Sequence, residues 1–318
     1  MTALFDENLP MDATRTLALY QRFYASQGPS LPAGKPDDMR FVEALTDVLD
    51  ECQGLILDSY GVIGLGSAPI DGITRFFDEA KARNIPIVIL TNGASQPAER
   101  RVKGYRDWGL SIAARDIISS RDAAYHIVCE IKEQTPEARF SYLGRHVTPF
   151  DDVPGPLYGA GDPSWDEADY FIFLGAIGWD EADQAYFESV LAKNGGKVII
   201  GNPDVSAPVV GAFTFEPGYW GMRAHYHTNV PLLMAGKPFQ TAYDIAFAAL
   251  QEKAGKPLDK AHIGMVGDSL HTDILGAKSC GLFAILLSDY GLLAGRDVMQ
   301  ETALAQIYPD VIAKTLVR

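Results

Sequence analysis

The stretch that most constrains the fold is residues 54–63, where a short apolar run ends in the carboxylate of Asp58. A run of this length between chain-breaking residues is typical of a β-strand that is buried on both faces. Asp58 then lies where the strand ends, and open α/β sheets bind their ligands beyond the carboxyl ends of the strands. A carboxylate there can act as a covalent nucleophile or hold a hard cation, although a purely structural aspartate fits the same pattern.

Further apolar runs repeat this pattern and alternate with helical segments. The runs are residues 85–90, 262–266 and 282–287, and each is short enough to be a buried strand. Segments 73–83 and 239–253 carry apolar side chains at the spacing of a helix that covers a sheet. The alternation predicts an α/β fold with a Rossmann-like parallel sheet.

The spacing of these runs also predicts an insertion. Residues 51–96 and 233–318 carry the strands described above and form the predicted core domain. Residues 97–232 between them contain their own alternation of strands and helices, and we expect them to form an inserted α/β cap domain. The strand-like runs of this segment are 140–143, 170–174 and 198–200.

Residues 1–50 are predicted to form a helical N-terminal extension. Apolar side chains recur at helical spacing in residues 17–24 and again in 41–49, on either side of the breaker-rich stretch 28–36. None of these residues suggests chemistry, so we expect an appendage that packs on the core or on a partner.

Charge and cysteine content narrow the class of protein. The formal net charge is -14, from 27 basic and 41 acidic residues, which disfavours nucleic acid and anionic membranes as partners. An anionic substrate would therefore need a local cation. The three cysteines are widely spaced, as expected for reduced thiols, and the first residues lack the pattern of a secretory signal. We therefore expect a cytoplasmic protein.

Five residues at predicted strand ends or loops carry the chemistry of the chain. Asp58 is the candidate nucleophile, and Thr91 offers a hydroxyl beside backbone N–H groups that suit an anion. Lys237 is a point cation for a phosphoryl group, and Asp268 and Asp273 can bind a small hard cation. Helix capping would explain Thr91 or Asp273 alone, and a solvated turn would explain Lys237 alone. Their common placement favours a single site.

These residues resemble the four motifs of the haloacid dehalogenase superfamily of aspartate-nucleophile hydrolases, and more narrowly its class IIA, the NagD-like phosphatases. The resemblance runs from about residue 53 to 295 and implies a parallel-sheet core with a cap inserted between the second and third motifs. The matching segments are 89–95 (ILTNGAS), 108–110 (WGL), 117–120 (IISS), 201–204 (GNPD), 236–238 (GKP) and 265–273 (MVGDSLHTD).

The resemblance implies a role for each catalytic and metal-binding residue. Asp58 would attack phosphorus and form an aspartyl-phosphate. Mg²⁺ would be held by Asp58, the main-chain carbonyl of Tyr60 and Asp268, with Asp273 as a ligand or beside the ligands. Thr91 and Lys237 would hold the phosphoryl oxygens. A metal ion and one lysine would supply the charge neutralisation that phosphoryl transfer needs.

The resemblance also implies a substrate and its contacts. Gly61, Asn92 and Gly93 would contact the substrate in the core, and Asp204 of the cap would contact its leaving group, although a turn-capping role fits Asp204 equally well. The expected partner is a small phosphorylated metabolite such as a sugar phosphate, and cap-mediated homodimers are implied.

Tyr60 departs from the family pattern, in which a second aspartate protonates the leaving group and then activates water. Tyrosine, with an ordinary pKa near 10, is a poor base at pH 7. General acid–base assistance contributes about 10²–10⁴-fold to rate, so we expect slow turnover.

Three functions remain open at this point. One is a phosphatase that uses another base or a labile substrate. The second is a dehalogenase-like hydrolase, because Asp58-Ser-Tyr-Gly61 resembles the first motif of the L-2-haloacid dehalogenases. The retained Asp268 and Asp273 argue against that function, because those enzymes need no metal. The third is a binding or regulatory protein that turns over little.

Overall fold

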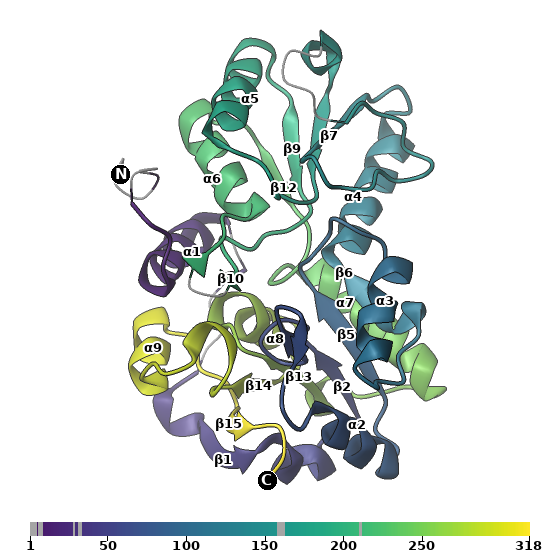
Figure 1. Cartoon of the computed structure of the whole chain (residues 1–318), viewed down its shortest axis with the longest axis vertical. Coiled ribbons are helices and arrows are strands. Elements are labelled where there is room, and N and C mark those ends of the chain that lie inside the picture. The colour runs from purple at the N-terminus through teal and green to yellow at the C-terminus, as the bar shows by residue number, and fades with distance from the viewer. Residues whose placement is uncertain (1–4, 6–8, 28, 31–33, 158–162, 210–211) are drawn as a thin grey trace.

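The computed structural model describes residues 5, 9–27, 29–30, 34–157, 163–209 and 212–318. Two α/β units lie one above the other in the view of Figure 1. We call the lower one, built on a seven-stranded sheet, the core unit, and the upper one, built on a four-stranded sheet, the cap unit. The predicted fold class is confirmed.

The sheet of the core unit is entirely parallel, in the order β1-β15-β14-β13-β2-β5-β6. Because all its strands run the same way, their carboxyl ends meet at one edge, which faces the cap unit. The strands are β1 (Arg40–Ala44), β2 (Gly54–Leu57), β5 (Ile87–Thr91), β6 (Ile117–Ser119), β13 (Ile263–Gly267), β14 (Phe283–Leu287) and β15 (Val311–Thr315).

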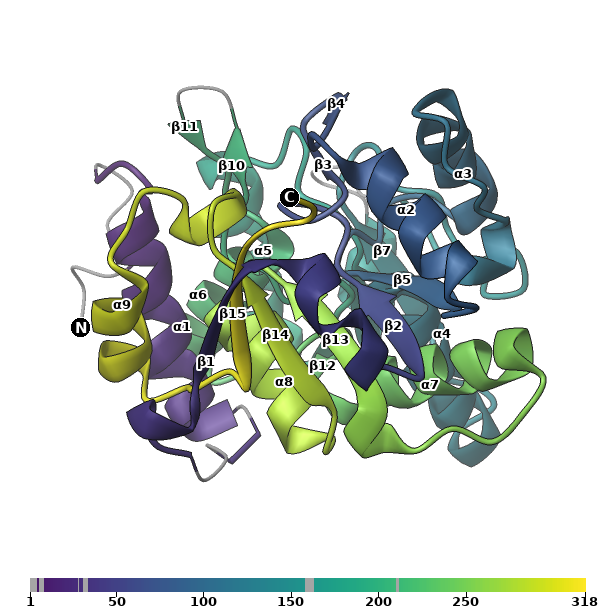
Figure 2. The ribbon, with the colours of Figure 1, turned by 90° about the horizontal axis from the view of Figure 1, so that it is seen from below.

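Helices cover both faces of this sheet (Figure 2). Leu55 and Leu57 of β2 point into one apolar core with Phe76, whereas Ile56 points into the other with Tyr243. This alternation explains why the whole strand is apolar. The helices of the core unit are α2 (Ile73–Ala82), α3 (Ala98–Asp107), α7 (Gln240–Ala254), a π-helix (Leu270–Ile274), α8 (Leu275–Ser279) and α9 (Val298–Ala305).

The cap unit has a parallel sheet in the order β12-β9-β8-β7. Its strands are β7 (Phe140–Leu143), β8 (Tyr170–Phe173), β9 (Lys197–Ile200) and β12 (Leu232–Met234). Its helices are α4 (Ser120–Gln134), α5 (Glu181–Asn194) and α6 (Pro217–Thr228). Short strand pairs are β3 (Gly64–Leu65) with β4 (Ala68–Pro69), and β10 (Pro208–Val209) with β11 (Ala212–Phe213).

Two sheet assignments bear on the predicted boundaries. Strand β6 lies within the range 97–232 predicted for the cap, yet it pairs with β5 of the seven-stranded sheet. Strand β12 crosses the predicted boundary at residue 233 and pairs with β9 of the cap unit. The division into domains otherwise stays a prediction.

The helical prediction for the second half of residues 1–50 is wrong in part. Helix α1 (Ala13–Gln27) forms as expected, but Arg40–Ala44 is an edge strand that pairs with β15. A 3₁₀ helix of seven residues, Leu45–Glu51, follows it. The edge of β15 supplies hydrogen-bond partners to the backbone of β1, and this pairing overrides the local apolar spacing. Phe41, read as part of an inward face, is 60% exposed.

No helix in the described ranges combines the length and the apolar character needed to span a bilayer.

Candidate active site

Asp58 and Lys237 form the centre of the site. Asp58 follows β2 directly, and its backbone N–H donates to the carbonyl of Val266 on the neighbouring strand β13. Lys237 is 2% exposed, and its Nζ donates to Asp58 Oδ1 at 2.5 Å and to Asp273 Oδ1 at 2.6 Å. A single buried ammonium group therefore bridges the end of β2 to the π-helix that follows β13.

Three carboxylates gather around this lysine. Asp58, Asp268 and Asp273 are all buried, and one oxygen of each lies within 4.8 Å of the others. Burial raises the pKa of Asp58; the charge of Lys237 lowers it, and those of Asp273 and Asp268 raise it again. Burial, together with the charge of Asp273, raises the pKa of Asp268 to about 7. The three carboxylates therefore carry more negative charge than the single ammonium group of Lys237 neutralises.

This donor set fits a hard divalent cation. Carboxylate oxygens in a close group are ligands that Mg²⁺ and Ca²⁺ prefer, and a cation between them would relieve their repulsion. Both oxygens of Asp273 already accept hydrogen bonds, from Lys237 and from the N–H of Ser269. Asp268 Oδ2 accepts from the N–H of Leu292 at 2.7 Å. Asp268 therefore keeps one oxygen free for a metal ion. Oδ1 of Asp58 can share that ion, because a carboxylate oxygen that accepts from Lys237 keeps a second lone pair.

The loop after β5 is braced by Asn92. Its Oδ1 accepts from the hydroxyl of Ser120 and the N–H of Lys237, both at 2.7 Å. Its Nδ2 donates to Asp204 Oδ1 at 2.8 Å and to the carbonyl of Lys237 at 3.1 Å. The side chain of Asn92 thus holds Lys237 and Asp204 in place, and its predicted contact with substrate stays a prediction. Thr91 Oγ1 accepts from the N–H of Gly93 at 3.3 Å.

Asp204 lies where the cap unit meets the site, and α1 reaches it as well. Tyr20 of α1 donates to Asp204 Oδ1 at 3.3 Å, and its hydroxyl accepts from the N–H of Val205 at 3.1 Å. The ring of Tyr20 stacks on His271 of the π-helix. Sequence reasoning found no chemistry in residues 1–50, because a tyrosine on an amphipathic helix carries no signal of its distant partner.

Gly61 is needed where the loop after Asp58 turns. Its φ is +83°, and a Cβ there would lie 2.4 Å from Asp268 Oδ2. A side chain would therefore both strain the backbone and displace a carboxylate of the site. Its N–H donates to the carbonyl of Gly64 at 2.9 Å, and the predicted contact of Gly61 with substrate stays a prediction.

Comparison with known proteins agrees with this geometry. Two family models, both of haloacid dehalogenase-like hydrolases, match residues 55–146 and 234–317. The matched segments contain Asp58, Thr91, Lys237 and Asp268, which are the residues that the fold brings together. The chain belongs to the haloacid dehalogenase superfamily. It is a hydrolase, as the motifs predicted.

Relatives of this hydrolase include an acid sugar phosphatase of Staphylococcus haemolyticus, 26% identical over 238 residues, which are 73% of this chain and 84% of that protein. A possible sugar phosphatase from Cytophaga hutchinsonii shares its fold, with a TM-score of 0.75, 24% identity and coverage of 88% of this chain and 99% of the other. A third similar structure is that of the glycerol phosphate phosphatase Rv1692 from Mycobacterium tuberculosis in complex with calcium. Its TM-score is 0.59 at 21% identity, and the match covers 76% of this chain and 67% of the other.

Tyr60 of this hydrolase is turned toward the β3–β4 pair. The backbone N–H of Gly66 hydrogen-bonds its hydroxyl. Burial raises the pKa of Tyr60, the Gly66 bond lowers it, and the charge of Asp268 raises it again, so the pKa stays above the ordinary value. The phenol is therefore neutral at pH 7 and is a poor base.

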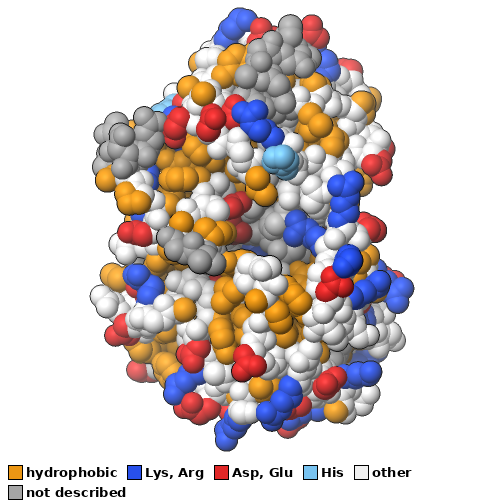
Figure 3. All heavy atoms as spheres, viewed as in Figure 1, with side chains coloured by type: hydrophobic (Ala, Val, Ile, Leu, Met, Phe, Trp, Pro, Cys, Tyr) orange, Lys and Arg blue, Asp and Glu red, His pale blue; other side chains and the backbone are white. Residues whose placement is uncertain are grey.

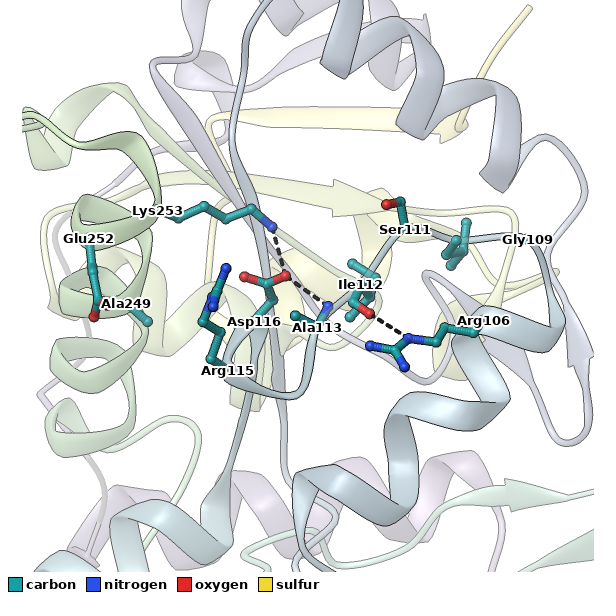
Figure 4. Close-up of a pocket in the computed structure, with 11 residues that line it drawn as sticks. Arg106, Gly109, Ser111, Ile112, Ala113, Arg115, Asp116, Ala249, Glu252 and Lys253 are labelled. Atoms are coloured by element: carbon teal, nitrogen blue, oxygen red, sulfur yellow. Dashed lines mark hydrogen bonds and ion pairs between the residues drawn. The ribbon is translucent and has the colours of Figure 1, made fainter.

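The surface of this hydrolase is hollowed between the two units on the face shown in Figure 3. A second hollow lies at the opposite end of the core sheet (Figure 4). It has a volume of about 800 Å³ and is lined by Arg106, Arg115, Asp116 and Lys253, among others. Asp116 accepts from the N–H of Ala113 at 2.9 Å and pairs with Lys253 at 3.0 Å, so these charges hold the loop before β6.

Proposed function

We propose that this hydrolase is a phosphatase that cleaves a small phosphomonoester through an aspartyl-phosphate on Asp58. The observation that carries the proposal is the position of Lys237, whose ammonium group holds one oxygen of Asp58 and leaves the other to attack. The sugar phosphatase names of its relatives support the same chemistry and suggest a sugar phosphate or a similar metabolite as the substrate.

The first chemical step uses residues whose positions are described above. The oxygen of Asp58 that Lys237 does not bind attacks phosphorus and forms a new P–O bond. The ester P–O bond breaks with its electron pair on the leaving oxygen, which takes a proton from solvent water to give the alcohol. Lys237 and the loop after Thr91 bind the phosphoryl oxygens, whose negative charge the buried ammonium group neutralises. Water then attacks the phosphorus of the aspartyl-phosphate and releases inorganic phosphate and free Asp58.

We propose Mg²⁺ as the cation of this site, held by Asp58, Asp268 and the carbonyl of Tyr60, with Asp273 orienting Lys237. When bound, the ion would neutralise charge on the phosphoryl group. The calcium in the structure of the Mycobacterium tuberculosis relative supports a hard divalent cation, and the buried carboxylates supply suitable ligands.

The neutral phenol of Tyr60 supports slow turnover, because no carboxylate occupies the place next to Gly61 from which the family protonates the leaving group. The same observation favours a second function, in which the protein binds a phosphorylated ligand and scarcely hydrolyses it. Pairing of two copies through the cap unit stays a prediction.

The test is phosphate release from a panel of phosphomonoesters, including sugar phosphates, pyridoxal phosphate and phosphoglycolate, with Mg²⁺ or with a chelator. We expect slow release that requires Mg²⁺ and disappears in Asp58→Asn. Hydrolysis at full rate in that variant would contradict the proposal. Binding of a phosphorylated ligand without phosphate release would establish the second function instead.

A further inference from the structure

Arg101 of α3 lies against the loop that follows Thr91. If Gly93 carried a Cβ, that atom would lie 2.8 Å from one η nitrogen of Arg101 and 3.0 Å from the other. The absence of a side chain at Gly93 therefore leaves room for the guanidinium group. The sequence motifs do not single out Arg101, because it follows Arg100 on a strongly charged helix.

Helix α3 also contacts the nucleophile loop. The hydroxyl of Tyr105, one turn after Arg101, lies 2.6 Å from the hydroxyl of Ser59, the residue that follows Asp58. Burial raises the pKa of Tyr105, the Ser59 bond and the charge of Arg101 lower it, and the charge of Asp58 raises it. One face of α3 is therefore close to both loops that build the site.

The guanidinium group of Arg101 forms no ion pair in the part of the chain that the structure describes, although the more distant charge of Asp122 acts on it. Its Nε donates to the carbonyl of Gln96 at 3.1 Å, and no carboxylate there forms an ion pair with it. The nearby Asp122 already accepts from the N–H and the hydroxyl of Ser119 through Oδ2. Burial lowers the pKa of Arg101, as expected for a cation that is partly removed from water.

Arg100, the residue before Arg101, is by contrast exposed and bonded to neighbouring side chains. Its Nη1 donates to Gln96 Oε1 at 2.7 Å and to Thr148 Oγ1 at 3.3 Å, so it joins α3 to the cap unit. A partly desolvated cation without a direct ion pair costs free energy. In a protein with a net charge of -14, such a cation beside a phosphate-binding loop is best explained by an anion that arrives with the substrate.

We propose that Arg101 is a substrate-binding residue, whose η nitrogens bind an oxyanion of the substrate beside the loop of Thr91, Asn92 and Gly93. The inference rests on the proposed phosphatase function and extends it. A guanidinium fork matches two oxygens of a carboxylate or phosphoryl group. The oxyanion is either the transferred phosphoryl group itself or a second anionic group of the same metabolite, and the two sources give different results below.

The test compares Arg101→Met and Arg101→Lys with Arg106→Met as the matched control. Arg106 is on the same helix but lines the hollow at the other end of the sheet (Figure 4). KM and kcat are measured for phosphoglycolate, which carries a carboxylate, and for glycerol phosphate, which carries none. Binding of inorganic phosphate is measured separately, by the shift that it causes in the unfolding temperature.

We expect Arg101→Met to raise KM by roughly 10- to 100-fold, as for loss of a charged hydrogen bond. Arg101→Lys should lie between Arg101→Met and wild type, and the Arg106→Met control should match wild type. Loss of phosphate binding together with a higher KM for both esters would identify the transferred phosphoryl group. A higher KM for phosphoglycolate alone would identify a second anionic group. Unchanged KM and phosphate binding would overturn the inference.

Stability separates a binding role from a structural one. Arg101→Met loses the Nε hydrogen bond to Gln96 but also a cation that no ion pair compensates, so its unfolding temperature should stay close to that of wild type, whereas a mainly structural role of Arg101 would lower it clearly. Should Arg101→Met fail to fold, Gly93→Ala supplies the second variant. Its methyl group would displace the guanidinium group and should raise KM without removing the charge; wild-type KM and phosphate binding in Gly93→Ala would overturn the inference.

If wild type releases no phosphate from any ester, the proposed function fails, and the phosphate-binding measurement still tests Arg101.

Discussion

A lysine contacts buried carboxylates at each end of the seven-stranded sheet, but the balance of charge around it differs between the two ends. At the carboxyl end, Lys237 faces three buried carboxylates and is almost fully enclosed. At the amino end, Lys253 pairs with the single carboxylate of Asp116 at 3.0 Å and also donates to the carbonyl of Ile87 at 2.8 Å. The first cluster has an excess of negative charge that a metal ion would balance. At the second end, Lys253 and Asp116 neutralise each other and join α7 to the starts of β5 and β6.

The largest effect is expected from Lys237→Met. Burial alone would lower the pKa of Lys237, but the charges of Asp273, Asp58 and Asp204 raise it, so the group is a permanent cation. Its loss would leave Asp58 and Asp273 buried without their counter-charge, at a cost of about 3–5 kcal/mol of unfolding free energy, and should abolish phosphate release. Denaturant unfolding, carried out with Mg²⁺ and with chelator, measures this loss of unfolding free energy. Unchanged stability in chelator would show that the carboxylates do not repel one another.

Tyr60→Asp should change the rate most in the opposite direction. It restores a carboxylate that can protonate the leaving group and then activate water, which is worth about 10²-fold or more when the group is well placed. The measurement is kcat for the best ester of the panel. Tyr60→Phe is the control and should keep the wild-type rate. No gain in a folded Tyr60→Asp variant would mean that the loop after Asp58 is arranged around the tyrosine.

The excess charge should also make the metal-free protein sensitive to pH. The pKa of Asp268 is about 7 in the folded protein and about 4 in an unfolded chain. The folded state therefore binds more protons between these values, and stability falls as pH rises from about 4 to 7. Unfolding temperatures in chelator at pH 5 and pH 7 should differ by several degrees. Mg²⁺ or Asp268→Asn should reduce the difference without removing it, because burial also raises the pKa values of Asp58 and Glu216. An undiminished slope in Asp268→Asn would assign it to these other groups.

The smallest effect is expected from Lys253→Met at the balanced end. Lys253 is partly exposed, so loss of its ion pair and hydrogen bond should cost about 1–2 kcal/mol. The site is at the other end of the sheet, so KM and kcat should stay at wild-type values. Paired measurements of unfolding and of phosphate release check both statements. A change in KM would show that the two ends are coupled.

Local pattern was enough to predict most of the core and the composition of the site. The run ending at Asp58 is apolar throughout because β2 packs on both faces, and the parallel strands then bring Asp58, Asp268 and the loop of Thr91 to one edge. Sequence spacing carries this information because strand direction and burial follow from short-range apolar patterning.

Contacts between distant segments could not be predicted in the same way. The edge strand β1 pairs with β15 at the far end of the chain, and its apolar spacing alone favoured a helix. The hydrogen bond from Tyr20 to Asp204 joins residues 184 positions apart. Neither contact leaves a local signal, because each residue is an ordinary member of its own segment.

The sequence by itself determined which groups are available for chemistry: the carboxylates of Asp58, Asp268 and Asp273, the ammonium group of Lys237, and a phenol rather than a carboxylate at Tyr60. The tertiary structure decided which charged and polar groups contact one another. In it Asn92 accepts a hydrogen bond from the N–H of Lys237, and Arg101 rather than Arg100 lies against Gly93. The physical reason is that residue type sets what a side chain can do, whereas only packing sets which charges share a buried volume and which stay in water.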